Sequence, residues 1–313
     1  MELETSGAYS LLYTLYGHTR SVASVVFSPD GEQLVSAGAD RQLQIWSTRT
    51  GRLLHTLAGH DGGVNSVCWT RDGKHVASAS DDRTVRVWEV EKARLVYTFT
   101  DHTSYVFCVA CHPQSTLLVS GGFDETIRLW DLQRGTCHRT ISAHSEAVTD
   151  VDFSRDGTMI ASCSYDGLIR LWDTSSGHCL RTLQHSDQAP LVSVRFSPSS
   201  LQLLAMSLDS AVRLWDLANA RVLKTYTGHV NTKYAGTALF AYLPSAALPQ
   251  TLVVAPSESR EIYLWDLQTK RVIQKLAGHR DAVAAIAVHP TLPVLASAGL
   301  EQDASIRLWV YST

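Results

Sequence analysis

Short runs in which apolar residues alternate with polar ones recur along the whole chain, as in "SVASVVF" (21–27) and "TVRVW" (84–88). This alternation is typical of half-buried β-strands. Turn signals such as "PDG" (29–31) and "RDG" (71–73) stand between the runs. No stretch sustains the period of an amphipathic helix. The pattern therefore predicts an all-β chain of short strands joined by tight turns.

One phrase of this pattern ends in tryptophan seven times, as in "IRLWDL" (127–132). The seven tryptophans follow one another at intervals of 42 to 50 residues: Trp46, Trp88, Trp130, Trp172, Trp215, Trp265 and Trp309. A histidine, usually in "GH", precedes six of them: His18, His60, His102, His144, His229 and His279. A repeat of about 40–45 residues with G-H and W-D is the signature of a WD40 propeller with four strands per blade. The sequence predicts one such domain, residues 1–313, with seven blades.

Each tryptophan of the first four blades has a serine ten residues and an aspartate six residues before it, and blade seven has an equivalent set. With the histidine, these side chains predict a buried chain of hydrogen bonds from aspartate to the tryptophan N–H. Blade five has Ala205 at the serine position and no "GH", and blade six has Ala255 and Ser259. We expect blades five and six to be the least rigid. A set repeated at fixed offsets indicates scaffold, in contrast to a Ser-His-Asp catalytic triad, which occurs once.

The N-terminal region supplies a strand that the last repeat lacks. An outer-strand phrase such as "LLHTL" (53–57) or "VIQKL" (272–276) follows six of the repeats. The seventh repeat has none, whereas an unpaired "LLYTL" stands at residues 11–15. We expect residues 11–15 to complete the seventh blade, which removes a free sheet edge, and residues 1–10 to form a short extension.

The composition excludes several classes of function. A net charge of −3 and a pI of about 6.5 argue against broad electrostatic binding of nucleic acid. No apolar run approaches the roughly 18 residues of a membrane helix, and "MELETSGAYS" has no signal-peptide core, so we expect no membrane association. The chain has no nucleophile elbow, P-loop or H-E-x-x-H motif, and we expect no enzymatic activity.

The stretch "YVFCVACH" (105–112) contains a C-x-x-C spacing that could indicate a metal or redox centre. Aligned on the repeat histidine, it is the innermost strand of blade three. Cys108 and Cys111 are three residues apart, so on a strand they face opposite sides and cannot ligate one metal. We expect structural thiols in a reduced, intracellular chain, with no metal and no cofactor.

The informative residue of this stretch is Phe107. Its column in the repeat otherwise holds small or medium side chains: Ala23, Asn65, Thr149, Val192, Ala235 and Ala284. A second column, at the predicted channel mouth, reads Ala39, Asp81, Phe123, Tyr165, Leu208, Glu258 and Gln302. Asp81 is expected to face outward. A lone aromatic wall beside an acidic rim suits an arginine side chain, and the alternative is that these residues only pack the rim.

Longer phrases point to one family of propellers. "HTSYVFC" (102–108), "PQSTLLVSGGFDETIRLWD" (113–131), "SYDGLIRLWDT" (164–174) and "LWDLQTKRVIQKLAGH" (264–279) resemble the WD-repeat protein five/Swd-three family, the propeller subunit of COMPASS and MLL histone methyltransferase complexes. The resemblance implies a nuclear, non-catalytic scaffold that binds an arginine-containing motif of the methyltransferase catalytic subunit. It also implies contacts with the histone H-three tail and with a second WD40 scaffold subunit.

The resemblance also implies site residues. Phe107 corresponds to one wall of the family's arginine slot, and the backbone carbonyls of Asn65 and Ala235 correspond to those that hold the guanidinium. The rim corresponds to Ala39, Gly63, Asp81, Phe123, Tyr165 and Tyr234. Thr237 stands where the family has a second aromatic wall, and Asn65 and Val192 replace serines, which implies either weaker arginine binding or a slot of a different shape.

A groove on the opposite face, where the family holds its second scaffold subunit, corresponds to Leu214, Phe240, Tyr242 and Gln268. An insertion at 241–252, "AYLPSAALPQTL", is expected to be a loop that reshapes this groove. A different class of function remains open, that of a ubiquitin-ligase substrate receptor or adaptor. Such propellers often carry W-D-x-R, whereas here the phrases read "WDLQ", "WDTS" and "WDLA".

Overall fold

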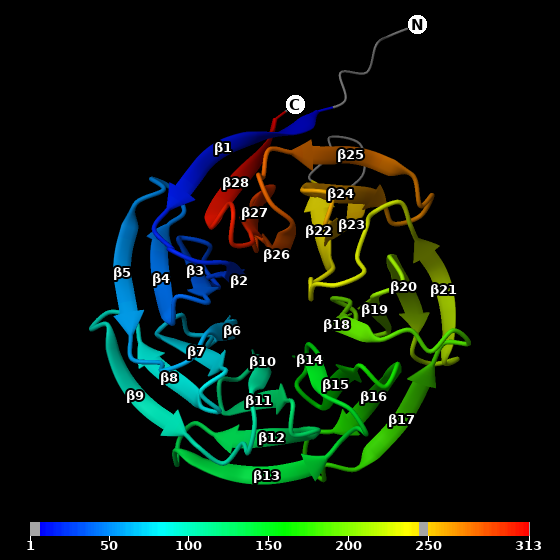
Figure 1. Ribbon diagram of the computed structural model, residues 1–313. Helices are drawn as coiled ribbons and strands as arrows, with labels where there is room; N and C mark the ends of the chain where they lie inside the picture. The colour runs from blue at the N-terminus through cyan, green and yellow to red at the C-terminus, as the bar shows by residue number, and fades with distance from the viewer. Residues whose placement is uncertain (1–6, 244–249, 313) are drawn as a thin grey trace, which may run out of the picture.

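The computed structural model of the chain describes residues 7–243 and 250–312. In these ranges the chain forms 28 strands in seven antiparallel sheets of four strands, arranged as a ring around a central channel (Figure 1). This confirms the predicted all-β, seven-bladed propeller. Among the described residues, no helix has the length and apolar character needed to cross a membrane.

The blades follow one another around the ring in chain order (Figure 1). In six blades the strand that comes first in the chain lies beside the channel, whereas in blade seven the first strand of the chain is the outermost one. Blade one contains β2 (Val22–Phe27), β3 (Gln33–Gly38), β4 (Gln42–Ser47) and β5 (Leu53–Ala58), and blade two contains β6 (Val64–Trp69), β7 (His75–Ser80), β8 (Val85–Glu89) and β9 (Arg94–Phe99). Blade three contains β10 (Val106–Cys111), β11 (Leu117–Gly122), β12 (Thr126–Asp131) and β13 (Thr136–Ser142), and blade four contains β14 (Val148–Phe153), β15 (Met159–Ser164), β16 (Leu168–Asp173) and β17 (Cys179–Gln184). Blade five contains β18 (Leu191–Phe196), β19 (Gln202–Ser207), β20 (Ala211–Asp216) and β21 (Arg221–Tyr226), and blade six contains β22 (Leu239–Leu243), β23 (Gln250–Pro256), β24 (Glu261–Asp266) and β25 (Val272–Ala277). Blade seven contains β26 (Val283–Val288), β27 (Val294–Gly299), β28 (Ser305–Ser312) and β1 (Ala8–Tyr16).

The N-terminal strand closes the ring, as predicted. β1 pairs antiparallel with β28, with Leu11 opposite Trp309 and Leu15 opposite Ile306. The strand begins at Ala8, so the expectation that residues 8–10 belong to an extension is wrong, and residues 1–6 lie outside the described ranges. Residues 8–10 join the strand because β28 runs to Ser312 and supplies a pairing partner for each of them.

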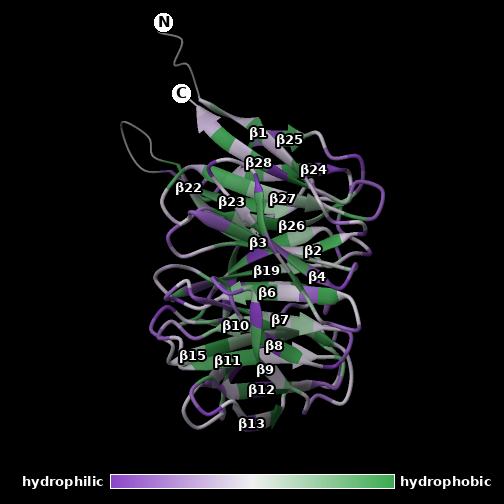
Figure 2. Cartoon of the chain, turned by 90° about the vertical axis from the view of Figure 1, so that its left-hand side faces the viewer, coloured by the Kyte–Doolittle hydropathy of each residue, from purple (hydrophilic) through white to green (hydrophobic). Residues whose placement is uncertain are grey.

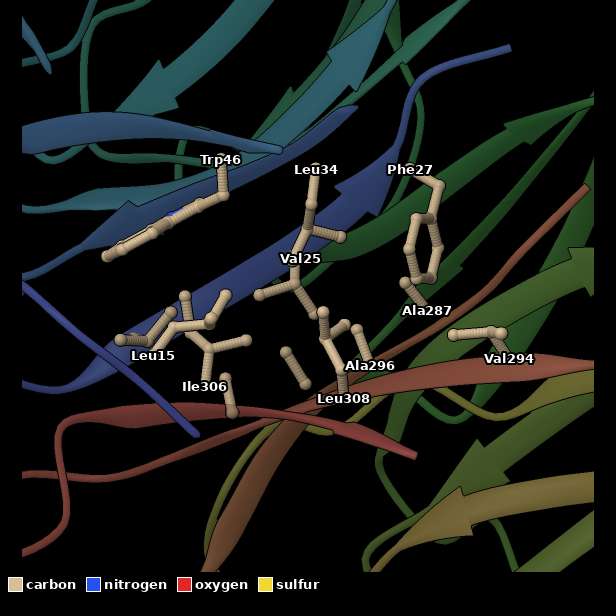
Figure 3. Close-up of a cluster of buried hydrophobic side chains, with 13 residues drawn as sticks. Leu15, Val25, Phe27, Leu34, Trp46, Ala287, Val294, Ala296, Ile306 and Leu308 are labelled. Carbon is tan, nitrogen blue, oxygen red and sulfur yellow. The ribbon is translucent and has the colours of Figure 1, made fainter. Parts of the chain in front are cut away.

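The apolar core is divided among the blades and the spaces between them. Between blades one and seven, Leu15, Val25, Leu34, Ile306 and Leu308 pack together from strands at opposite ends of the chain (Figure 3). In side view the strands are mainly apolar and the connecting loops on both faces mainly polar (Figure 2). The ring is therefore held by contacts between sequential sheets, and its closing contact joins the two termini.

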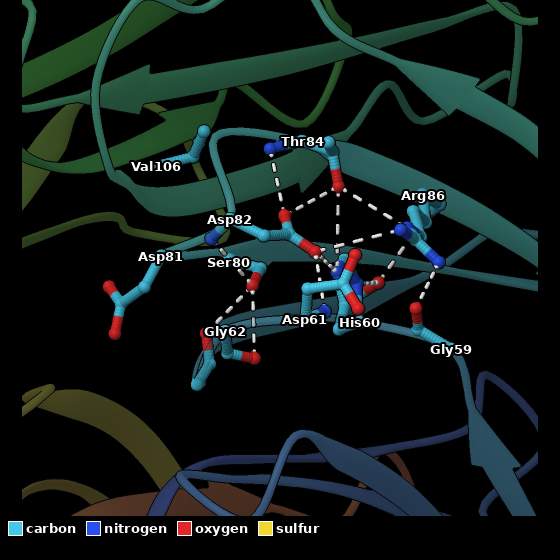
Figure 4. A network of polar contacts seen from close by, with 12 residues as sticks. Gly59, His60, Asp61, Gly62, Ser80, Asp81, Asp82, Thr84, Arg86 and Val106 are labelled. Atoms are coloured by element: carbon cyan, nitrogen blue, oxygen red, sulfur yellow. Dashed lines mark hydrogen bonds and ion pairs between the residues drawn. The ribbon is translucent and has the colours of Figure 1, made fainter.

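Five of the seven blades contain the predicted hydrogen-bonded chain. In blade one, His18 Nδ1 lies 2.8 Å from the Asp40 carboxylate, its Nε2 lies 2.8 Å from Ser36 Oγ, and Trp46 donates its Nε1–H to the same serine at 2.9 Å. The equivalent sets are complete in blades two, three, four and seven. Although burial opposes it, hydrogen bonds from His60 and Thr84 hold the pKa of Asp82 well below its usual value (Figure 4).

Blades five and six lack this chain. In blade five, Arg213 donates to Asp209 and to Ser207, at 2.5 and 2.6 Å, and the buried Trp215 Nε1–H has no partner among the described residues. In blade six, neither ring nitrogen of the buried His229 has a partner in the described part of the chain, and burial lowers its pKa to about 4. Trp265 instead donates to the carbonyl of Thr227 at 3.2 Å.

Candidate functional site: the central channel

The channel is a cavity of about 900 Å³ that the innermost strands surround. It is lined by every member of the Phe107 column: Ala23, Asn65, Phe107, Thr149, Val192, Ala235 and Ala284. In six blades this residue is the second of its strand and coincides with a shift of register against the neighbouring strand. A β-bulge leaves the extra residue out of the ladder and re-aims its side chain. The column therefore faces the channel, as the repeat pattern predicted.

Phe107 is part of an aromatic chain on blade three. Its ring meets that of Phe123 edge to face, with centroids 6.2 Å apart, and Phe123 meets Tyr105 at 6.4 Å. Phe123 is 56% exposed and Tyr105 is 51% exposed. Tyr105 was not among the predicted site residues, although it occupies the same repeat position as Gly63 and is far larger there. Blade three thus presents an apolar wall that continues from the channel to its mouth.

Asp81 makes a hydrogen bond that the sequence did not predict. Its Oδ1 accepts a hydrogen bond from Asn65 Nδ2 at 2.7 Å, and the same amide donates to the carbonyl of Val106 at 3.0 Å. Figure 4 shows the Asp81 carboxylate pointing away from the Asp82–His60 network. It therefore points away from Asp82, as expected, but it is not free as predicted, because the amide of Asn65 holds one oxygen at the channel. Its Oδ2 accepts no hydrogen bond from a described residue.

The remaining predicted rim residues belong to several different blades. Gly63 accepts the Asp81 N–H at 2.9 Å and lies against Ala39 of the preceding blade. Tyr165 and Tyr234 are each 38% exposed. Gly63 thus lies next to both Ala39 and Asp81, whereas the two tyrosines stand on separate blades.

Ala235 and Thr237 lie in a segment without strand structure, because β22 begins only at Leu239. Both line the same cavity as Phe107. Within the described ranges, no residue donates a hydrogen bond to the Ala235 carbonyl, which leaves that oxygen free to accept one. Thr237 places a small, half-buried side chain in the cavity wall, where the family resemblance expects an aromatic ring.

The cavity lining also contains a charged cluster that was not predicted from the sequence. Arg195 Nη1 lies 2.5 Å from Asp150 Oδ2, which also accepts the Val194 N–H at 3.0 Å. Asp152 accepts the Phe196 N–H at 2.8 Å, and burial raises its pKa to about 6. These bonds join blade four to blade five. One feature of the sequence could have predicted this cluster. The strand "VTDVDF" (148–153) contains two aspartates, whereas the other innermost strands carry no carboxylate.

The second predicted groove is only partly a surface feature. Phe240 and Tyr242 line a cavity of about 350 Å³ between blades five and six, and Tyr242 is 48% exposed. Gln268 is exposed and accepts a hydrogen bond from Lys224 Nζ at 2.8 Å. Leu214 is 2% exposed in the core beneath Phe240, so its assignment to the groove surface is wrong. It points inward because alternate residues of a strand face opposite sides.

The predicted insertion loop is shorter than 241–252. Residues 241–243 belong to β22 and residues 250–252 to β23, and Leu243 pairs with Gln250. Residues 244–249 lie outside the described ranges. The hairpin strands extend farther than the prolines suggested because cross-strand pairing continues to the ends of both segments.

The two cysteines of the C-x-x-C spacing lie in different environments. Cys108 is buried against Gly121 and Val148, whereas Cys111 packs with a separate apolar cluster. Burial raises the pKa of both thiols, that of Cys111 to about 12. Across residues 7–243 and 250–312, no group of three or more His, Cys, Asp or Glu side chains is arranged to hold a metal ion.

Two curated proteins match short parts of the chain. Protein Mut11 of Chlamydomonas reinhardtii is 48% identical over 44 residues, which is 14% of this chain and 12% of that protein. The uncharacterized WD repeat-containing protein sll1491 of Synechocystis sp. is 54% identical over 41 residues, 13% of this chain and 12% of that protein. Each match covers about one repeat, and the chain spans only about an eighth of the length of these relatives.

A family model covers far more of the chain. The model described as the WDR5 beta-propeller domain matches residues 14–310. This range contains all seven tryptophan phrases and the last three residues of β1. The chain therefore belongs to the WDR5 beta-propeller family.

Proposed function

We propose that the channel mouth binds the side chain of an arginine in a partner peptide. The observation that supports this most directly is Phe107, the one aromatic member of a seven-residue column that lines the cavity. An arginine side chain is long and thin enough to enter such a channel. Its planar guanidinium stacks on an aromatic face and donates several hydrogen bonds.

The neighbouring groups complement that cation. Asp81 keeps one carboxylate oxygen without a partner among the described residues, and the Ala235 carbonyl is likewise free to accept. The Asn65 amide fixes the other Asp81 oxygen, so the carboxylate is held ready at the mouth. Because Thr237 leaves the opposite wall without a ring, we expect stacking on one side only and modest affinity.

Two substitutions test the slot in opposite directions. Phe107→Ala should weaken binding of an arginine peptide by about tenfold or more, since it removes a cation–π contact together with its packing. Thr237→Phe should tighten binding because it adds a second wall. Titration calorimetry with a short acetylated and amidated peptide, one arginine between alanines, measures both effects. The control is the same peptide with alanine in place of arginine, and equal binding of the two peptides contradicts the proposal.

At the level of assembly, we propose a nuclear scaffold subunit of a COMPASS-type complex that methylates lysine four of histone H-three. The family and the propeller fold support a protein-interaction role. The proposed partners are the methyltransferase catalytic subunit, through an arginine-containing motif, and a second WD40 scaffold subunit at the Phe240–Tyr242 groove. The histone tail is a further candidate ligand of the channel.

Purification of the tagged full chain from its native cells, followed by mass spectrometry, tests this assignment. We expect a methyltransferase and a second scaffold subunit to co-purify, and the methyltransferase to be lost from the Phe107→Ala variant. Co-purification of a cullin and its adaptor would instead favour the ubiquitin-ligase alternative.

A further inference from the structure

The carboxylate of Glu258 binds three consecutive backbone N–H groups of the channel rim. Thr232, Lys233 and Tyr234 donate to its Oε1 at 2.8, 2.6 and 3.0 Å, respectively. The Thr232 hydroxyl donates to the other oxygen, Oε2, at 2.9 Å. Successive N–H groups that converge on one point form an anion-binding concavity, or nest. Here the anion belongs to the same chain.

The rim segment of blade six needs such an anchor because it has no strand partner. In the five blades with a complete histidine set, the innermost strand begins four residues after the histidine, as from His18 to Val22. In blade six the histidine is residue 229 and β22 begins at Leu239. The two preceding N–H groups, of residues 230 and 231, also depend on side chains and donate to serine hydroxyls at 3.0 and 2.9 Å.

The charge of Glu258 suits this role. Burial opposes ionisation, but the hydrogen bonds from the three N–H groups and the threonine hydroxyl keep the pKa of Glu258 below its usual value. The carboxylate is therefore ionised at neutral pH, where charge-assisted hydrogen bonds are about twice as strong as neutral ones. Residues 232–234 end directly before Ala235, which lines the cavity and whose carbonyl accepts no hydrogen bond from a described residue.

We propose that Glu258 is a positioning residue for arginine binding: its carboxylate fixes residues 232–234 and thereby holds the Tyr234 ring at the rim and the Ala235 carbonyl in the channel. This inference rests on the proposed arginine slot and adds a residue to it. Glu258 was predicted to stand in the rim column, but its role follows only from the three N–H groups that converge on it.

The test uses the full chain and the arginine peptide described above. Glu258→Ala should weaken binding by about tenfold, because the nest loses its anion. Glu258→Gln should have an intermediate effect, since an amide oxygen still accepts hydrogen bonds but carries no charge. Added formate should restore part of the affinity of Glu258→Ala by filling the nest, and should not affect the wild type. Glu301→Ala is the matched control, because it removes the same charge from an exposed turn of blade seven.

Hydrogen–deuterium exchange of residues 232–235 without peptide separates this inference from the proposed function. We expect faster exchange there in Glu258→Ala and near wild-type exchange in Glu301→Ala. Unchanged affinity and exchange in Glu258→Ala overturn the inference, as does lost affinity with unchanged exchange, which would indicate a direct effect of charge. If the wild type binds the arginine and alanine peptides equally, the proposed function fails, while the exchange result still reports whether Glu258 orders the segment. If Glu258→Ala does not fold, Glu258→Gln provides the same comparison.

Discussion

At the scale of single residues, the same side chain has different surroundings in different blades. His102 bonds to Asp124 and Ser120 at 2.8 and 2.7 Å, and Trp130 completes its chain. His229 is equally buried, but both of its ring nitrogens lack partners among the described residues. It is surrounded instead by aromatic rings, with Trp265 at 5.4 Å. A buried histidine therefore stabilises its blade by hydrogen bonding in one case and only by packing in the other.

We expect His102→Ala to destabilise the protein more than His229→Ala. Removing His102 leaves a buried carboxylate and hydroxyl without their partner, which typically costs roughly 3–5 kcal/mol. Removing His229 breaks no hydrogen bond to a described residue and relieves a desolvated ring, so only packing is lost. Urea denaturation of the two variants measures the difference. Equal midpoints would show that the bonded chain adds nothing beyond packing.

At the scale of elements, the sheet of blade five forms normally although its internal hydrogen bonds are incomplete. β19 and β20 pair in register, with Ala205 opposite Arg213 and Leu203 opposite Trp215. Arg213 and Asp209 form an ion pair within the blade, but the Trp215 Nε1–H remains without a described acceptor. A buried unsatisfied donor costs about 1–3 kcal/mol. Ladder hydrogen bonds and apolar packing therefore determine the strand arrangement, and the histidine set adds stability to it.

Ala205→Ser should stabilise the protein by about 1 kcal/mol, because it returns an acceptor for Trp215. In the five complete blades the equivalent serine accepts the tryptophan N–H at 2.8 to 2.9 Å. The hydroxyl proton can bond to the carbonyl of the facing strand, as Ser36 does with Gln44 at 3.3 Å.

The urea midpoint measures this change. The control is the same substitution in a Trp215→Phe background, where no N–H remains and the gain should vanish. A similar gain in both backgrounds would exclude the hydrogen bond as its cause.

At the scale of the whole molecule, stability depends on joining the two ends of the chain. β1 is the outer strand of blade seven, and it also contacts blade six, where Tyr9 and Gln274 exchange two hydrogen bonds of 2.8 Å. Leu15 packs in the cluster between blades seven and one. The N-terminal strand thus contributes to three consecutive blades.

Deletion of residues 1–16 should lower the melting temperature clearly. It exposes the edge of β28 and removes Leu15 and Tyr9 from two apolar clusters, and loss of a single large buried side chain typically costs about 2–5 kcal/mol. Differential scanning calorimetry compares the truncated and full chains. The control is Leu12→Ser, because Leu12 is 44% exposed on the same strand and its replacement should change little. An unchanged melting curve after deletion would disprove closure by β1.

Much of the fold follows from the sequence by itself. The spacing of the seven tryptophans determines the number of blades, the serine and aspartate offsets identify which five blades carry the bonded chain, and the unpaired phrase at residues 11–15 identifies the closing strand. The repeat column also shows that Phe107 faces the channel. These features can be predicted from the sequence because strand period and repeat length are local properties of the chain.

Only the tertiary structure decides which atoms of different blades meet. It places Asn65 on Asp81, brings Arg195 of blade five to Asp150 of blade four, and directs Glu258 to the N–H groups of residues 232–234. None of these contacts is part of the repeat, so no column predicts them. They depend on how neighbouring sheets twist and pack, and on which backbone groups a missing stretch of strand leaves without partners.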